Sequence, residues 1–144
     1  MIYISHRGNL NGKVVERENS PQYIKEAIEA GYFVEVDLWW ENSSLWLGHD
    51  EPQYKTSVYD LKDMSTRLMC HAKNHKAITA LNDADLHWFW HDNDDYTITS
   101  QGFIWAYPGK PSVGENTIAV LPEIHETDTQ LFYGICSDYI ERYK

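Results

Sequence analysis

Short apolar segments recur along the whole chain, separated by polar turns and by a few stretches with helical spacing. Strands that alternate with helices favour parallel β-α-β units. Ser20 and Pro21 are typical of a helix start, and Gly31 is typical of a helix end. Further helices are predicted over 58–64 and 76–84, with a helical turn over 128–132, and strands over 2–5, 33–38, 45–47, 67–72, 86–90, 96–99, 103–106, 117–121 and 134–136.

The length of the chain limits how these units can close. Its 144 residues fit one domain, 1–144. A full (β/α)8 barrel takes about 250 residues. The pattern therefore predicts an α/β fold, a reduced (β/α)8 barrel in which several helices are short or missing. The alternative is an open α/β sheet with fewer parallel strands and one β-hairpin, formed by 96–99 and 103–106.

The chain is strongly acidic, with a formal net charge of −10. Surfaces that bind nucleic acids or dock on anionic membranes carry basic patches. The acidic charge of this chain therefore argues against both functions. An acidic protein that acts on a phosphate needs a cation or a few local basic residues to bind it. The charge is therefore compatible with a divalent metal site.

Cysteine content and hydropathy bear on location. Cys70 and Cys136 have no zinc-site spacing, and we expect free buried thiols. No apolar run reaches 18 residues, so no integral membrane segment is expected. The first residues lack the basic and apolar regions of a signal peptide, which favours a cytoplasmic location.

Two carboxylates stand out in the strand predicted over 33–38. Glu35 and Asp37 are two residues apart, so their side chains point to the same side of the strand. A buried parallel strand is normally apolar on both faces, and carboxylates there need a pairing group or a cation. Hard oxygen ligands suit Mg²⁺ or Ca²⁺. Spacing alone leaves two interpretations, a metal site or a solvated strand face.

Two histidines follow predicted strands, and each has a glycine close by. His6 and His49 can both give and take protons near neutral pH, so together they can serve as general base and general acid at a phosphorus centre. Arg7 can bind a phosphate through two N–H groups, or form a surface salt bridge.

Four short motifs in series resemble the glycerophosphodiester phosphodiesterase family. They are His6-Arg7-Gly8, Glu18-Asn19-Ser20 at a helix entry, Glu35-x-Asp37, and His49-Asp50. The resemblance implies a TIM-type barrel of the phosphatidylinositol-phospholipase-C-like superfamily. It also implies that His6 and His49 are the acid–base pair, Glu35 and Asp37 hold a divalent cation, Arg7 contacts the phosphate, and Glu18 and Asn19 support the site.

Beyond residue 50 the resemblance covers less of the chain. Lys73 matches the lysine of the family's Glu-x-Lys strand, but His71 stands where the family has a metal-binding glutamate. Imidazole shifts the metal preference from Mg²⁺ or Ca²⁺ toward Mn²⁺ or Zn²⁺. The alternative is that the metal site is weakened or lost. Trp105 resembles an aromatic residue at the mouth of the site, and Glu123 follows the seventh core strand, where a carboxylate could serve the site. The histidine and acids of residues 91–95 either line the mouth of the barrel or form an acidic turn, and the turn is the interpretation that we favour.

These features predict a metal-dependent phosphoric diester hydrolase of lipid metabolism that cleaves a small glycerophosphodiester-like substrate by acid–base catalysis with His6 and His49. One alternative is a lyase of the phospholipase or sphingomyelinase D type that releases a cyclic phosphate. Another is a phosphate-binding barrel without turnover. Missing helices leave apolar strand surface uncovered, so self-association as a homo-oligomer is expected.

Overall fold

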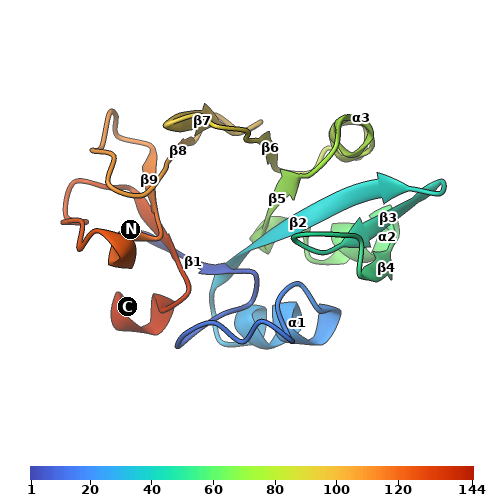
Figure 1. The fold of residues 1–144 in the computed structure, drawn as a ribbon, viewed down its shortest axis with the longest axis horizontal. Helices are drawn as coiled ribbons and strands as arrows, with labels where there is room; N and C mark the ends of the chain where they lie inside the picture. The colour runs from blue at the N-terminus through green and yellow to red at the C-terminus, as the bar shows by residue number, and fades with distance from the viewer.

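The computed structural model describes residues 1–144 as a mixed, curled sheet with few helices (Figure 1). The helices are α1 (Pro21–Glu29), α2 (Val58–Asp63) and α3 (His75–Asp83), with short 3₁₀ turns at Ser65–Arg67, Pro122–Ile124 and Ile140–Arg142. The strands are β1 (Ile2–His6), β2 (Phe33–Glu41), β3 (Ser44–Leu47), β4 (Tyr54–Thr56), β5 (Leu68–Ala72), β6 (Trp88–Trp90), β7 (Tyr96–Ile98), β8 (Ile104–Ala106), β9 (Thr117–Val120) and β10 (Gly134–Ser137).

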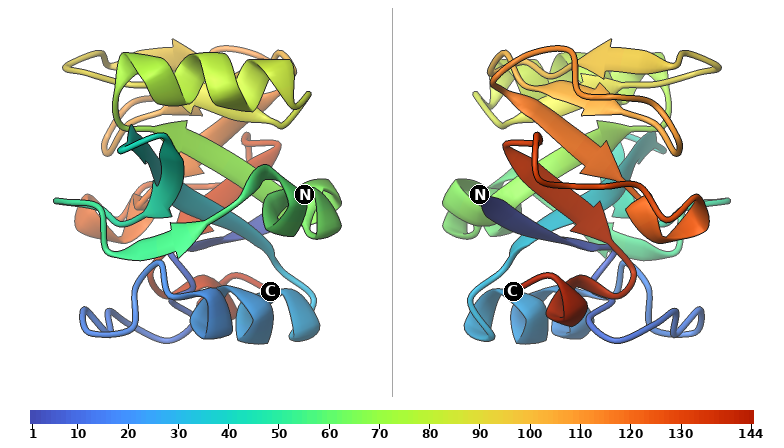
Figure 2. Two further views of the ribbon diagram at one scale, coloured as in Figure 1. Left: turned by 90° about the vertical axis from the view of Figure 1, so that its right-hand side faces the viewer. Right: turned by 90° about the vertical axis from the view of Figure 1, so that its left-hand side faces the viewer.

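Parallel pairing dominates the middle of the sheet. In spatial order, β6, β5, β2, β1, β10, β9 and β8 each pair in parallel with the next. The remaining ladders are antiparallel: β3 pairs with the end of β2, β4 with β3, and β7 with β8. The arrowheads of the parallel strands point to one side of the sheet, with α3 near one end of the molecule and α1 beside the C-terminal turn at the other (Figure 2).

The predicted (β/α)8 barrel is wrong. Only three helices of six to nine residues are present. Loops with no α-helix link β8, β9 and β10, so no continuous helical layer covers the sheet. β7 runs antiparallel to β8, and no ladder joins β7 to β6. The chain has too few residues for eight helical crossovers, and the result is a mostly β, curled half-barrel.

The alternative prediction, an open sheet with one β-hairpin, is confirmed for the hairpin, because β7 and β8 pair over the predicted segments. The side chain of Ser20 accepts a hydrogen bond from the backbone N–H of Tyr23 (3.2 Å), and Gly31 has φ +96°, so both ends predicted for the first helix are confirmed. The helical turn predicted over 128–132 is absent, and the nearest 3₁₀ turn is Pro122–Ile124. Both cysteines are free and buried.

Along each parallel strand, side chains alternate between the face that packs against the helices and the face inside the curl. In β2, Val34, Val36 and Leu38 are fully buried in the cluster that packs against the helices. The opposite side chains point into the curl, where a second apolar cluster lies. Its buried members come from six different strands: Ile4, Met69, Phe89, Trp105, Ile118, Val120 and Cys136.

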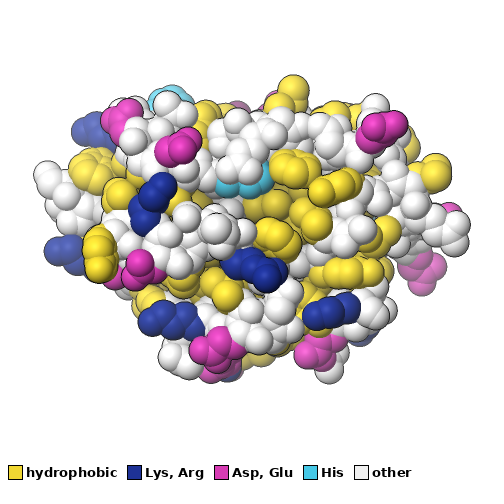
Figure 3. Space-filling view, turned by 180° about the vertical axis from the view of Figure 1, so that it is seen from behind, with side chains coloured by type: hydrophobic (Ala, Val, Ile, Leu, Met, Phe, Trp, Pro, Cys, Tyr) yellow, Lys and Arg dark blue, Asp and Glu magenta, His cyan; other side chains and the backbone are white.

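Hydrophobic side chains gather around the middle of the face seen from behind in Figure 3, where the strands begin. A cavity of about 530 Å³ lies among residues at or just before the strand starts, including Ile2, Phe33, Phe103 and His87. His87 is buried, and one ring nitrogen, Nε2, lies 2.7 Å from the hydroxyl of Thr99. None of the helices combines the length and the apolar character that a membrane-spanning segment requires.

We predict that His87 makes the fold sensitive to mild acid. Burial lowers the pKa of His87 to about 4. Between that value and the pKa of an unfolded histidine, near 6.5, the unfolded state binds the extra proton, so stability falls as the pH decreases through this window. Urea unfolding should show a loss of up to about 3 kcal/mol between pH 7 and pH 4 from this residue.

The variant His87→Gln isolates that contribution, because all carboxylates titrate alike in both proteins. Its free energy of unfolding should decline less steeply below pH 6.5 than that of the wild type. Identical pH profiles for the two proteins would contradict this prediction.

Candidate metal and acid–base site

The parallel register brings inward side chains of neighbouring strands together. His6 of β1 is the register partner of Glu35 in β2, and Asp37 is that of His71 in β5. Nε2 of His6 lies 3.8 Å from Oε2 of Glu35. Because parallel strands end at the same edge, these four side chains converge at the carboxyl ends of the strands.

Glu35 and Asp37 are almost completely buried, at 3% and 0% exposure. Asn19 binds Asp37 twice: its Nδ2 donates to Oδ2 (2.8 Å) and its Oδ1 accepts the backbone N–H (2.9 Å). Nδ1 of His71 lies 3.2 Å from Oδ1 of Asp37 and 3.7 Å from Oε1 of Glu35. Oε2 of Glu35 and Oδ1 of Asp37 have no hydrogen-bond partner. Buried carboxylate oxygens without donors are costly, so this pair lacks a balancing group.

Arg7 supplies part of the positive charge that the two carboxylates need. Its Nη1 donates to Oε2 of Glu18 (3.1 Å), and its Nε lies 3.1 Å from Oδ2 of Asp37 without hydrogen-bond geometry. The backbone is left-handed at Arg7 (φ +58°) and at Asn19 (φ +63°), and a 3.0 Å hydrogen bond from the Asn19 N–H to the Arg7 carbonyl joins them. Left-handed backbone is unfavourable for such residues, and it persists here in the two loops that hold the carboxylates' partners.

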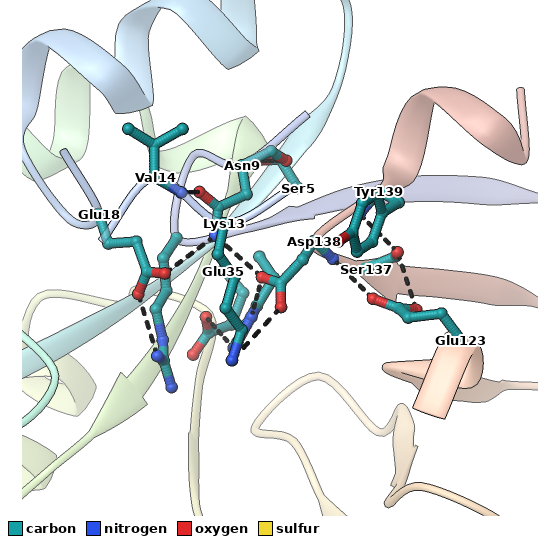
Figure 4. Close-up of polar contacts among 12 residues, drawn as sticks. Ser5, Asn9, Lys13, Val14, Glu18, Glu35, Glu123, Ser137, Asp138 and Tyr139 are labelled. Carbon is teal, nitrogen blue, oxygen red and sulfur yellow. Dashed lines mark hydrogen bonds and ion pairs between the residues drawn. The ribbon is translucent and has the colours of Figure 1, made fainter. Parts of the chain in front are cut away.

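A carboxylate near the C-terminus, Asp138, binds the ring of His6. Figure 4 shows Asp138 with its other partners Asn9 and Glu123. Nδ1 of His6 lies 2.7 Å from Oδ1 of Asp138, which also accepts a bond from Nδ2 of Asn9 (2.9 Å). Glu123 in turn accepts from the backbone N–H of Asp138 (3.1 Å) and from the hydroxyl of Ser137 (2.9 Å). This network fixes the orientation of the imidazole and leaves its Nε2 toward the carboxylate cluster.

His49 approaches the site from the loop after β3. Its Nδ1 lies 2.6 Å from Oδ1 of Asp50. The preceding Gly48 is required by the turn, since a Cβ there would overlap the carbonyl oxygen of Glu51. His49 is about two-fifths exposed, unlike the buried His6, so it forms the solvent-facing side of the site.

A cavity of about 380 Å³ opens over the cluster. Lys73, which follows β5, contributes to its rim through a side chain of intermediate exposure. The lining brings residues from six strands and their loops to one place: His6, Arg7, Glu35, His49, His71, Lys73, Phe89, His91, Asp92, Trp105, Tyr107, Pro108, Val120 and Leu121.

The two carboxylates differ in their affinity for protons. Burial and the neighbouring charge of Asp37 raise the pKa of Glu35. Burial also acts to raise the pKa of Asp37, but the adjacent His71 and Arg7 outweigh it, and that pKa lies below its usual range. The unmet demand for positive charge therefore falls mainly on Glu35.

The environments of His6 and His49 shift the pKa values of the two rings in opposite directions. Burial acts to lower the pKa of His6, but the hydrogen bond to Asp138 and the charge of Glu35 outweigh it, so the pKa is raised. The pKa of His49 is lowered, by burial first and then by the charge of Arg7. Pairs of titratable groups whose environments separate their pKa values are typical of acid–base sites.

The residues present fit a divalent cation. One ligand atom each from Glu35, Asp37 and His71 lies within 4.8 Å of the others. A cation would satisfy the two carboxylate oxygens that have no hydrogen-bond partner. Two oxygens and one imidazole nitrogen form a mixed ligand set that Mn²⁺ and Zn²⁺ accept more readily than Ca²⁺ does.

Most residues singled out in the sequence meet here. His6, Arg7, Glu35, His49, His71 and Lys73 line the cavity, while Asp37, Glu18 and Asn19 lie beneath it or beside it. Two placements differ from expectation. Trp105 is 2% exposed and forms the floor of the cavity, not its mouth. Glu123 does not line the cavity and acts only on Ser137 and Asp138.

Sequence reasoning assigned no catalytic or metal-binding role to three residues that the structure places in the site, although it left His91 as a possible residue of the barrel mouth. Asp138 lies two residues beyond the strand predicted over 134–136, but its contact with His6 spans 132 positions. His91 and Tyr107 line the cavity together with Asp92, and residues 92–95 are exposed, as expected of an acidic turn. Each of the three lies two positions after an inward apolar residue, Cys136, Phe89 or Trp105, and this period of two is the signal that could have found them.

Comparisons of the chain with protein-family models, with curated proteins and with solved structures gave no match.

We predict that Glu35→Gln has opposite effects with and without metal. In chelator, the variant should be at least as stable as the wild type, because a carboxyl whose pKa is raised by folding destabilises the native state above its unfolded pKa. At about 100 times its dissociation constant, Mn²⁺ should stabilise the wild type by about 2.7 kcal/mol and leave the variant unchanged. Thermal unfolding measures both, with the exposed Glu29→Gln as the matched control. A large loss of stability in chelator, or equal stabilisation by Mn²⁺, would contradict the prediction.

We predict that Asp138→Asn lowers the pKa of His6. The charged hydrogen bond is the strongest influence raising that pKa, so the neutral amide should let the ring lose its proton at lower pH. Titration of the histidine ring protons by NMR, in metal-free protein, measures this. His49 is the internal control, because its partner is Asp50. An unchanged His6 titration would show that Asp138 does not govern it.

Proposed function

We propose that the protein is a divalent-cation-dependent phosphodiesterase. The observation that supports it best is a group of side chains at one cavity: Glu35 and the underlying Asp37, each with one carboxylate oxygen that lacks a hydrogen-bond partner, two histidines in contrasting environments and two basic side chains. The resemblance of the four N-terminal motifs to glycerophosphodiester phosphodiesterases points to the same chemistry. The proposal depends on these side chains and their positions and not on the fold.

The basic side chains would bind the anionic diester. Arg7 is fixed by Glu18 and lies beside the carboxylates, and Lys73 stands across the cavity rim. A cation bound by Glu35, Asp37 and His71 would add positive charge at the phosphate oxygens. Together the charges would offset the negative charge that builds up in the transition state.

The histidines would move the protons. Nε2 of His6 faces the cluster with its ring held by Asp138, and Nε2 of His49 is not engaged by Asp50. In diester cleavage one ring takes the proton of the attacking hydroxyl, and the other donates a proton to the departing alkoxide. A buried ring and a half-exposed ring on the same cavity provide two distinct proton carriers.

We predict metal-dependent cleavage of bis-p-nitrophenyl phosphate. Activity should appear with Mn²⁺, Mg²⁺ or Zn²⁺, disappear in chelator, and fall about 10² to 10⁴-fold in His6→Ala and in His49→Ala. The exposed His125→Ala, outside the cavity, is the matched control and should retain wild-type rates. Phosphorus NMR of the products distinguishes hydrolysis from release of a cyclic phosphate.

Two results would overturn this proposal. One is the absence of cleavage with every ion from protein shown to be folded. The other is cleavage that survives both histidine substitutions.

A further inference from the structure

A second hollow lies next to the cavity over the site, and two residues line both of them. The first compartment, of about 380 Å³, and the second, of about 300 Å³, share Arg7 and His49 as lining residues. A phosphodiester has an alcohol on each side of its phosphate. Since Arg7 and His49 belong to the proposed phosphate site, each compartment lies where one alcohol would extend.

The first compartment is walled by aromatic rings. Trp105 stacks on Phe89 with ring centroids 4.7 Å apart, and Phe89 stacks on His71 at 4.8 Å. Nearer the rim, His91 and Tyr107 stack at 3.6 Å and are partly exposed. The hydroxyl of Tyr107 and Nδ1 of His91 have no hydrogen-bond partner. Flat rings and unmet polar atoms together suit a ring that carries polar substituents.

The second compartment has the opposite character. Only Val15 among its nine lining residues is hydrophobic. Lys13 and Gln53 contribute hydrogen-bonding side chains, and Glu18, Asp50 and Glu51 contribute carboxylates that can accept from hydroxyl groups. Such a lining suits an alcohol with several hydroxyl groups and gives no stacking surface.

We propose that the substrate is a mixed phosphodiester, with an aromatic or heterocyclic alcohol against His91 and Tyr107 and a polyhydroxy alcohol beside Gln53. This inference rests on the proposed function, because it places the phosphate between the two compartments at Arg7 and His49. The inference is drawn from the contrast between the two linings. It limits the substrate class to phosphodiesters with two unlike alcohols.

Two monoesters test the compartments without turnover of a diester. Phenyl phosphate and glycerol phosphate, titrated in the presence of Mn²⁺ by calorimetry, report on the ring side and the polar side. Tyr107→Leu should weaken the affinity for phenyl phosphate about tenfold, because a stacking surface is lost. It should change the affinity for glycerol phosphate less than about twofold. Tyr107→Phe keeps the ring and should keep the phenyl phosphate affinity. Gln53→Leu should weaken glycerol phosphate about fivefold and spare phenyl phosphate.

Equal changes for both probes in each variant, or phenyl phosphate binding that Tyr107→Leu leaves intact, would overturn the inference. Cleavage of bis-p-nitrophenyl phosphate by the same proteins separates this failure from failure of the function. Unselective binding with metal-dependent cleavage refutes the two compartments alone. Selective binding without cleavage supports the compartments and refutes the phosphodiesterase.

Discussion

Two carboxylates buried side by side on β2 impose the main constraint on this structure. Glu35 and Asp37 occupy inward positions where a parallel strand normally carries apolar side chains. Asn19 and Arg7 adopt left-handed backbone to reach Asp37, and His71 faces both carboxylates from β5. These contacts satisfy Asp37 better than Glu35, whose pKa is raised. This uneven balance of charge is what supports our proposal of a cation at this site.

The curled sheet explains how so short a chain can build such a site. Inward positions alternate along each strand, so an apolar residue deep in the curl is followed, two positions later, by a polar one at the carboxyl end. Ile4 precedes His6 in this way, and Met69 precedes His71. The apolar layer closes the floor, and the polar layer faces the cavity. The strands alone achieve this without a full layer of helices, because only the inner face of the sheet is needed to position the side chains.

Local signals predicted local structure well. The cap at Ser20, the stop at Gly31 and the β7–β8 hairpin depend on neighbouring residues, and all three are present. Whether the sheet closes into a barrel was not predictable, because the spacing of strands along the chain does not reveal whether β6 and β7 pair. The same limit applies to the site. The carboxylates and histidines of the first 50 residues could be selected from motif and spacing. Asp138 could not be assigned to His6, because only the pairing of β1 with β10 brings those residues together.

The most direct test of this account is crystallography of the protein grown or soaked with Mn²⁺, with diffraction data that record the anomalous signal of manganese. The account predicts one anomalous peak bound by Glu35, Asp37 and His71, with Oε2 of Glu35 or Oδ1 of Asp37 directed at the ion. A map without a peak there at saturating Mn²⁺, with the two carboxylates bridged by a shared proton or by water, would contradict it.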